Sequence, residues 1–115
     1  MAVTLHASGT QTATVTTEHS LASIIVAGTF VFEVDTNAMA AGDILELRAY
    51  TIILASGTKR LTLFSPFYGA QPSWDLVKVS LPLSNDLADT NSIEYSLKQT
   101  FGTGRAFPWK VLRHS

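Results

Sequence analysis

The sequence predicts an all-β fold: a jelly-roll-like antiparallel β-sandwich of about seven or eight strands with an extended N-terminal arm. Three observations predict it. Apolar and β-branched residues alternate with polar ones over short runs. Turn-forming Gly, Pro, Asn, Asp and Ser separate the runs at intervals of roughly 8 to 12 residues. Two connections, residues 35–43 and 84–92, are long enough to cross between sheets.

Composition limits the classes of protein. A chain of 115 residues forms one domain with its own core, and it contains no cysteine for disulfides or thiolate metal sites. The net charge is −1 and no run of Lys or Arg could neutralise several phosphates, so we expect no nucleic-acid partner. Only 15% of residues are charged while 46% are hydrophobic. This favours a subunit that buries surface against neighbours; a monomer with a Thr- and Ser-rich surface is the alternative.

The first 17 residues lack the basic start and the long apolar stretch of a signal peptide. No window approaches the roughly 20 apolar residues that cross a bilayer. We therefore expect a chain made in the cytoplasm, without a membrane partner.

Residues 1–17 are expected to form either an arm that pairs with a neighbouring subunit or the first edge strand, ahead of a β-sandwich domain over residues 18–115. Threonines occupy every second position of this segment at Thr10, Thr12, Thr14 and Thr16. In a strand, that spacing places four hydroxyl groups on one face.

The body begins with strands predicted over residues 21–26 and 29–35, joined at Gly28. Phe30, Phe32 and Val34 occupy alternate positions of the second strand and should face the core. After it, capping side chains at 35–37, an Ala-rich stretch and Gly42 predict one short helical turn.

The next strand is predicted over residues 43–55, with inward side chains at Leu45, Leu47, Ala49 and Ile53. A tight turn at 56–59, in which Gly57 adopts a positive φ, would return the chain along residues 60–67. Pro66 and Pro72 bracket an aromatic stretch that we expect to be a strand end and a loop, because proline donates no ladder hydrogen bond.

A further strand over residues 74–83 should face the core through Val77, Val79, Leu81 and Leu83, with Lys78 and Ser80 pointing away. Residues 84–92 are polar and predict a surface loop, with room for one helical turn. The last two strands, 92–101 and 105–113, are expected to pair through a hairpin at Gly102-Thr103-Gly104, with Phe101 facing inward like Leu97 and Tyr95.

The residues that could carry chemistry form no convincing set. The histidines, His6, His19 and His114, lack the spacing of a metal site. Glu33, Asp35 and Asp43 could surround calcium, but they match no calcium loop and are explained as capping and turn residues. No serine lies in a Gly-x-Ser-x-Gly elbow, and residues 102–105 lack the ending of a phosphate-binding loop. We expect no enzyme activity, cofactor or metal.

Two exposed aromatic residues, Tyr68 and Trp74, lie beside prolines in the predicted loop. They could form a stacking platform for sugars or a contact site for a protein partner. The alternative is an aromatic plug that closes one end of the sandwich. With the four threonines, they are the candidate partner-binding residues.

Two blocks of sequence carry a resemblance to known proteins. The first runs through Ala27-Gly28-Thr29-Phe30-Val31 to Asp35, Asn37-Ala38-Met39 and Gly42-Asp43-Ile44-Leu45-Glu46-Leu47-Arg48. The second comprises Tyr95-Ser96-Leu97-Lys98-Gln99-Thr100, Gly102-Thr103-Gly104-Arg105 and Phe107-Pro108-Trp109-Lys110. Together they span roughly residues 27 to 112 and resemble a family of small structural proteins of tailed bacteriophages.

The resemblance implies a non-enzymatic virion protein, a head decoration or cement protein that binds the phage major capsid protein on the capsid surface. It implies no catalytic residues. A homo-oligomer, dimer or trimer, is expected because closed symmetry repeats one interface. A tail or neck protein of the same virion and a carbohydrate-binding module remain the alternatives.

Overall fold

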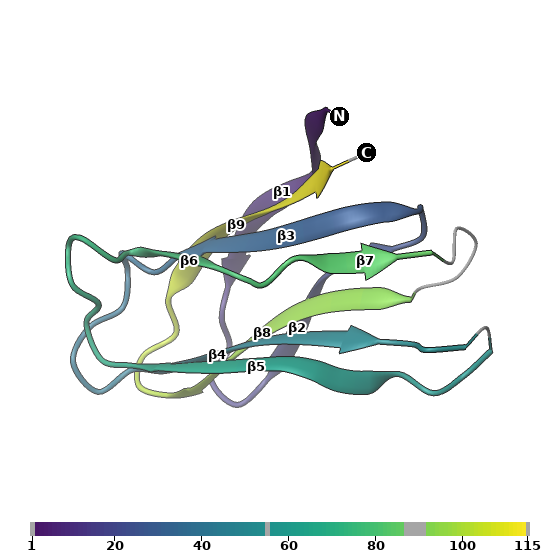
Figure 1. Cartoon of the computed structure of the whole chain (residues 1–115). Helices are drawn as coiled ribbons and strands as arrows, with labels where there is room; N and C mark the ends of the chain where they lie inside the picture. Colours follow the sequence, from purple (N-terminus) through teal and green to yellow (C-terminus); the bar gives the residue numbers. More distant parts are fainter. Residues whose placement is uncertain (1, 55, 87–91, 115) are drawn as a thin grey trace.

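The computed structural model describes residues 2–54, 56–86 and 92–114. These residues form nine antiparallel strands in two sheets and no helix, which confirms the all-β prediction (Figure 1). None of them belongs to a helix that could cross a membrane. The strands are β1 (Val3–Thr12), β2 (Glu18–Ile24), β3 (Gly28–Asp35), β4 (Ile44–Thr51), β5 (Arg60–Tyr68), β6 (Val77–Val79), β7 (Leu83–Asn85), β8 (Ile93–Phe101) and β9 (Ala106–His114).

The two sheets lie one above the other in a sandwich-like arrangement (Figure 1). Sheet A has the order β1-β9-β3-β6, and β7 also pairs with β3. Sheet B has the order β2-β8-β4-β5. Most connections between consecutive strands lead from one sheet to the other. Within the described residues, β4 and β5 are consecutive strands that pair with each other and form a hairpin.

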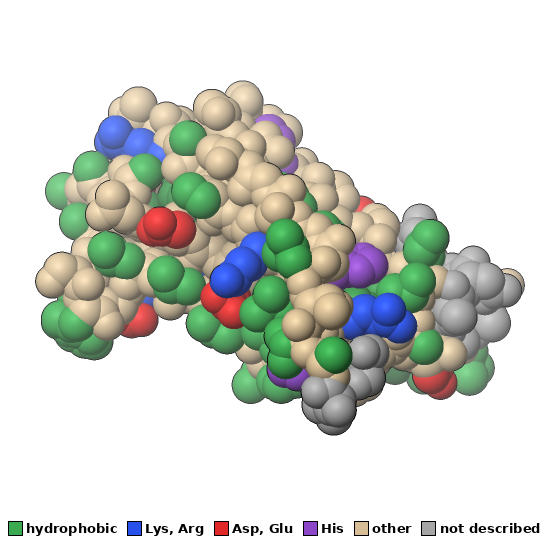
Figure 2. Space-filling model, turned by 90° about the horizontal axis from the view of Figure 1, so that it is seen from above, with side chains coloured by type: hydrophobic (Ala, Val, Ile, Leu, Met, Phe, Trp, Pro, Cys, Tyr) green, Lys and Arg blue, Asp and Glu red, His purple; other side chains and the backbone are tan. Residues whose placement is uncertain are grey.

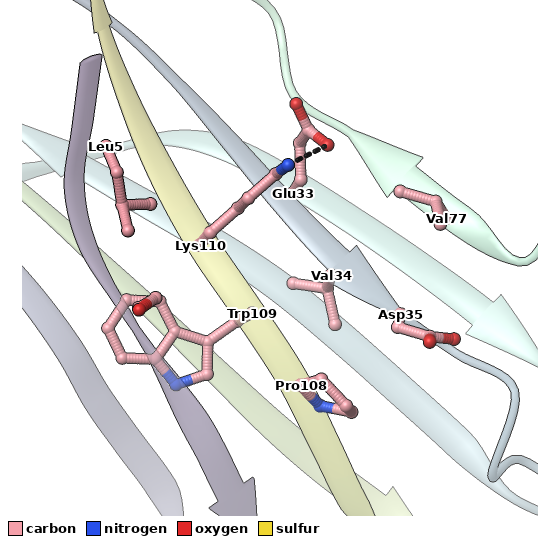
Figure 3. A pocket seen from close by; sticks show the side chains of 9 residues that line it. Leu5, Glu33, Val34, Asp35, Val77, Pro108, Trp109 and Lys110 are labelled. Atoms are coloured by element: carbon pink, nitrogen blue, oxygen red, sulfur yellow. Dashed lines mark ion pairs between the residues drawn. The ribbon is translucent and has the colours of Figure 1, made fainter.

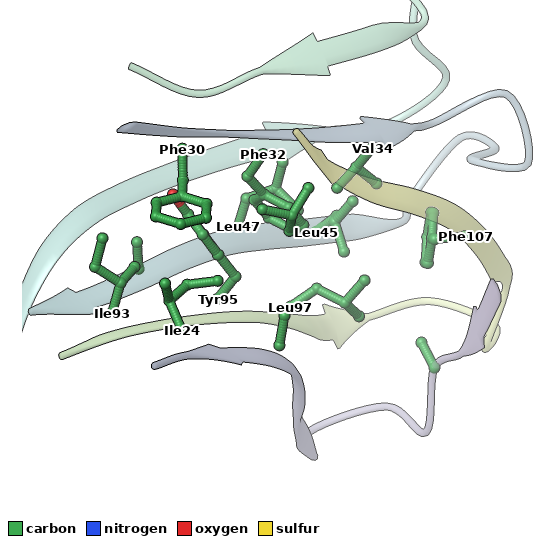
Figure 4. Close-up of a cluster of buried hydrophobic side chains, with 14 of the residues drawn as sticks. Ile24, Phe30, Phe32, Val34, Leu45, Leu47, Ile93, Tyr95, Leu97 and Phe107 are labelled. Atoms are coloured by element: carbon green, nitrogen blue, oxygen red, sulfur yellow. The ribbon is translucent and has the colours of Figure 1, made fainter. Parts of the chain in front are cut away.

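The core lies between the sheets and is formed by the inward side chains of both (Figure 4). The alternation predicted for β3 and β4 is confirmed by fully or almost fully buried side chains at Phe30, Phe32, Val34, Leu45, Leu47 and Ala49. Tyr95 on β8 stacks on Phe32 with a centroid separation of 4.9 Å. Ile53 lies beyond the end of β4 and is 80% exposed, so its predicted inward position is wrong.

The helical turn predicted after β3 is wrong. Two tight turns replace it, closed by hydrogen bonds from Met39 N to Thr36 O (3.1 Å) and from Asp43 N to Ala40 O (3.1 Å). Thr36 is buried, and both its backbone N–H and its hydroxyl donate to Leu76 O. These bonds tie the segment to the strand connection beside it, so it cannot coil into a helix.

The hairpin predicted at residues 102–104 is also wrong, because β8 belongs to sheet B and β9 to sheet A. The segment is a corner between the sheets, built around the buried side chain of Gln99. Its Nε2 donates to the carbonyls of Phe101 (3.1 Å) and Thr103 (2.7 Å), and its Oε1 accepts from Arg105 N (3.1 Å). A register shift against β4 leaves Phe101 exposed and Gln99 inward.

The single strand predicted over residues 74–83 is two short strands, β6 and β7. The predicted orientation is wrong for β6 but correct for Leu83 of β7, which packs against the core. Val77 and Val79 are exposed, while Lys78 is 7% exposed. The Lys78 ammonium lies 4.8 Å from the centroid of the Phe67 ring and donates to the backbone carbonyl of Asp75 (2.7 Å) and to its carboxylate (3.0 Å). These contacts satisfy a charge that alternation alone places in solvent.

Two turn predictions around β5 are corrected as well. The strand continues through Pro66 to Tyr68, which is tolerated because β5 is an edge strand that pairs on one side. The β4–β5 connection spans residues 52–59 and is longer than the predicted tight turn. The positive φ in it belongs to Ser56 (65°), while Gly57 N donates to Leu54 O (2.9 Å). Most of the predicted 84–92 loop, residues 87–91, lies outside the described residues.

Candidate functional site

The outer face of sheet A is the candidate site. Side chains paired across neighbouring strands point to the same side of a sheet, so the register defines this face. Leu5 of β1, Leu112 of β9 and Val31 of β3 form one apolar row. Val79 and Val77 extend the face onto β6 and are 61% and 49% exposed. Figure 2, which looks down on sheet A, shows hydrophobic side chains spread over this face, with basic and acidic side chains between them.

A groove of about 320 Å³ runs along this face between β1, β9, β3 and β6 (Figure 3). Its lining residues are Leu5, Ser8, Glu33, Val34, Asp35, Val77, Pro108, Trp109 and Lys110. The Trp109 indole lies against Gly9, where a Cβ atom would come within 3.3 Å of the ring. Gly9 therefore allows the indole to lie flat along β1. Trp109 pairs with Val34, whose side chain is buried, and its half-buried ring packs against the core.

One ion pair is recorded on this face in the described part of the chain. Lys110 Nζ lies 3.8 Å from Glu33 Oε1, and the Lys110 side chain is about half exposed. A pair this long at a surface contributes about 0 to 1 kcal/mol to stability. Both charges are therefore free to reorient toward a partner that contacts the apolar residues around them.

The outer face of sheet B differs, because most of its polar groups already bind one another, although Phe64 on this face is 47% exposed. Arg48 pairs with Glu18 (2.9 Å) and with Glu46, and the hydroxyls of Tyr50 and Ser96 donate to Glu18 at 2.7 and 2.6 Å. Burial raises the pKa of Glu18, but the two hydroxyl donors and the Arg48 charge outweigh it and lower this pKa below its ordinary value. Most polar groups of this network thus have partners within the protein, and Arg48 Nε is the buried atom of the network left without a hydrogen bond among the described residues.

The predicted aromatic residues lie elsewhere. Tyr68 ends β5 and Trp74 lies in the β5–β6 connection; they are 67% and 83% exposed. The aromatic-plug alternative is therefore wrong. Both rings present apolar surface to solvent, and their role in binding stays a prediction.

The four predicted threonines do not share one strand face. All four are exposed, but β1 ends at Thr12, so only Thr10 and Thr12 lie on it. Thr14 and Thr16 belong to the β1–β2 connection, where Thr16 has a φ of 71° and its N–H donates to Gln99 O (2.7 Å). Residues 3–12 pair with β9 of the same chain from Val3↔His114 to Thr12↔Ala106, which makes this segment an edge strand.

The candidate calcium carboxylates are engaged within the protein. Asp43 is buried and accepts hydrogen bonds from Ala40 N (2.9 Å) and Arg105 Nε (2.8 Å), and Asp35 accepts one from Asn37 N (2.9 Å). The described residues contain no group of three His, Asp or Glu side chains placed to hold a metal ion.

Sequence reasoning missed the outward valines of β6, which border the groove. The available signal was Asp75, three residues before Lys78 and able to pair with an inward ammonium.

Comparison of the chain with protein-family models, with curated proteins and with solved structures found no match. The surfaces of the molecule therefore carry the functional argument.

Proposed function

We propose that this protein is a non-enzymatic virion structural protein, a head decoration or cement protein, that binds the major capsid protein of a tailed phage through the outer face of sheet A. The observation that carries the proposal is the contrast between the two outer faces. Sheet A exposes Leu5, Val77 and Val79 around a groove, whereas sheet B presents a polar network bound within the protein and one exposed aromatic ring, Phe64. Contiguous exposed apolar surface is typical of a binding site. The resemblance to phage structural proteins supplies the identity of the partner.

We also infer that the sandwich is a jelly roll. If β6 and β7 count as one interrupted strand, the described residues form eight strands. The first pairs with the last, the second with the seventh, the third with the sixth and the fourth with the fifth. This nested pairing is that of a long hairpin rolled into two sheets. Double-sheet jelly rolls of eight strands are used by viral capsid and lectin domains, which fits the proposed role.

A pair of point variants tests the proposal. Val79→Lys places a charge on the outer face of sheet A, and Ile53→Lys places the same charge on an exposed apolar residue of the β4–β5 hairpin. We expect Val79→Lys to lose binding to purified heads, measured by cosedimentation, because the interface would bury an unpaired charge. Ile53→Lys should bind like the parent protein. Both should keep the parent circular dichroism spectrum.

Equal head occupancy for the two variants would contradict docking through sheet A. A parent protein that binds labelled tails and not heads, seen by negative-stain microscopy, would replace the decoration role by a tail or neck role. Deleting residues 2–17 is a poor test, because it removes β1 from sheet A.

A second candidate function is carbohydrate binding by Tyr68 and Trp74, favoured by the exposure of both rings. A glycan array probed with the parent protein and with Trp74→Ala tests it. Binding that Trp74→Ala abolishes and Val79→Lys preserves would support the module; no binding by the parent protein would remove it.

A further inference from the structure

Strand β1 is a sheet edge whose second half, residues 7–12, lacks the features that block edge pairing. Natural proteins protect such edges with charges, prolines, bulges or short strands. Among the described edges, β5 carries Pro66, β2 carries Glu18 and a register shift, and β6 and β7 are three residues each. β1 has ten residues, with no Pro, Lys, Arg, Asp or Glu. Its one irregularity lies between Leu5 and Ala7, so residues 7–12 are regular.

The ladder with β9 defines which backbone groups of β1 face the open side. Ala13 N donates to Arg105 O (2.8 Å), one pair beyond Thr12↔Ala106. Groups that face a partner strand recur at every second residue of an antiparallel pair. Gln11 and Gly9 therefore face β9, and Thr10 faces away. Pro108 lies opposite Thr10, at a pair whose backbone N–H groups do not face the partner strand. The N–H that proline lacks therefore removes no hydrogen bond between β1 and β9.

The open side of β1 thus carries the N–H and C=O groups of Ser8, Thr10 and Thr12, of which the Thr12 carbonyl also accepts a hydrogen bond from Gln11 Nε2 (3.0 Å). The side chains of these three residues point to the outer face of sheet A, since Ser8 is paired with Lys110 and Thr10 with Pro108. An incoming antiparallel strand must place outward side chains opposite outward side chains. Its register is therefore restricted.

We propose that the occupant is β1 of a second copy of this chain, paired antiparallel about a two-fold axis at Thr10. This register sets Thr10 opposite Thr10 and Ser8 opposite Thr12, so that all three open residues of each copy find partners. It also sets Gly9 opposite Gln11 on the inner side, without a clash of large side chains. Facing Thr and Ser pairs stabilise antiparallel strands.

A second copy fits better than a foreign strand because the edge is self-complementary. Residues 7–12 carry no charge, so two copies meet without repulsion. The pairing extends sheet A across the two-fold axis and leaves its outer face open. The dimer rests on the geometry of the free protein and does not depend on the proposed binding to heads.

Engineered cysteines test the register, because the chain has no cysteine of its own. In the proposed dimer, the two Thr10 Cα atoms form a hydrogen-bonded pair about 5.5 Å apart, which is within the range that a disulfide spans. The two Thr12 Cα atoms lie four residues apart along the strands, about 14 Å. Under mild oxidation we expect Thr10→Cys to run as a cross-linked dimer on a non-reducing gel and the matched Thr12→Cys to stay a monomer.

Sedimentation equilibrium of the free protein provides the second test. The parent chain should have twice the 12.4 kDa monomer mass. Thr10→Pro removes an N–H on the open side and should shift the mass to the monomer, while Thr10→Val keeps that N–H and should stay dimeric. A monomeric parent protein, or Thr12→Cys cross-linking as well as Thr10→Cys, would overturn the proposal. If Thr10→Pro does not fold, the cysteine pair and the parent mass decide.

Discussion

Arg105 Nε donates to the carboxylate of Asp43 at 2.8 Å and so joins the corner after β8 to the turn before β4. Asp43 is 1% exposed and also accepts hydrogen bonds from Ala40 N and, at 3.3 Å, from Thr103 N. One carboxylate thus holds two segments together, the turn at residues 40–43 and the corner at residues 102–105. A charge buried this deeply is stable only because each of its contacts is a donor.

The stability supplied by Asp43 should depend on pH. Burial raises the pKa of this carboxyl, but the hydrogen bonds from Ala40, Arg105 and Thr103 outweigh burial and lower the pKa below its ordinary value. A lowered pKa in the folded state stabilises the protein above the unfolded-state pKa of about 3.9, and this contribution is lost as the pH falls through the folded-state pKa.

We therefore expect Asp43→Asn to lower the free energy of unfolding at pH 7 by about 1–3 kcal/mol. The difference from the parent should shrink below about pH 4. Urea unfolding at several pH values measures it, with Asp86→Asn, which alters an exposed carboxylate, as the control. A pH-independent difference would contradict the role of the charge.

Gly102 should tolerate no side chain. It has a φ of 98°, and a Cβ atom there would lie 2.1 Å from Asp43 Oδ1 and 2.9 Å from Asp43 Cα. Gly69 also has a positive φ, 71°, but nothing lies within 4 Å of its Cβ position. Gly69→Ala should cost about 1–2 kcal/mol of backbone strain, and Gly102→Ala distinctly more because it also displaces Asp43. Equal losses of unfolding free energy would show that the corner adjusts freely.

Lys78 and Lys110 should contribute unequally to stability. Both form ion pairs on sheet A, but Lys78 is buried against Phe67 and Asp75, whereas Lys110 is about half exposed and 3.8 Å from Glu33. Lys78→Ala should lower the free energy of unfolding by about 2–4 kcal/mol, because it removes packing and a satisfied charge. Lys110→Ala should change it by less than about 1 kcal/mol. Thermal and urea unfolding measure both losses. Similar losses of unfolding free energy for the two variants would contradict this prediction.

Tyr95 allows a test of what a buried hydroxyl group contributes to the stability of the core. Its side chain is fully buried on Phe32, and its hydroxyl has no hydrogen-bond partner among the described residues. Burial raises the pKa of this phenol, so it stays protonated. Tyr95→Phe removes an unpaired hydroxyl and should leave the free energy of unfolding unchanged or raise it by up to about 1 kcal/mol. A loss larger than 1 kcal/mol would reveal a hydrogen bond to that hydroxyl.

Local alternation predicted the all-β class and the inward faces of β3 and β4 correctly. Phe30, Phe32 and Val34 bury because a strand turns successive side chains to opposite faces, which is a property of neighbouring residues alone. The candidate site was only partly predictable. Tyr68 and Trp74 are exposed as expected, but the row of Leu5, Leu112 and Val31 joins three strands whose pairing no local pattern encodes.

Tertiary structure alone decided which sheet receives each strand and which way β6 faces. Glycines at 102 and 104 suit a hairpin and a corner equally well, and the buried Gln99 amide selects the corner by binding its backbone. Val77 and Val79 point outward because the inward Lys78 side chain lies against the Phe67 ring and reaches the half-exposed carboxylate of Asp75. The contacts of Gln99 and Asp75 are local in the chain, but β8 and β9 enter different sheets because they pair with strands that are distant in sequence. The energies of that pairing exceed the preference of any single position for one side of a strand.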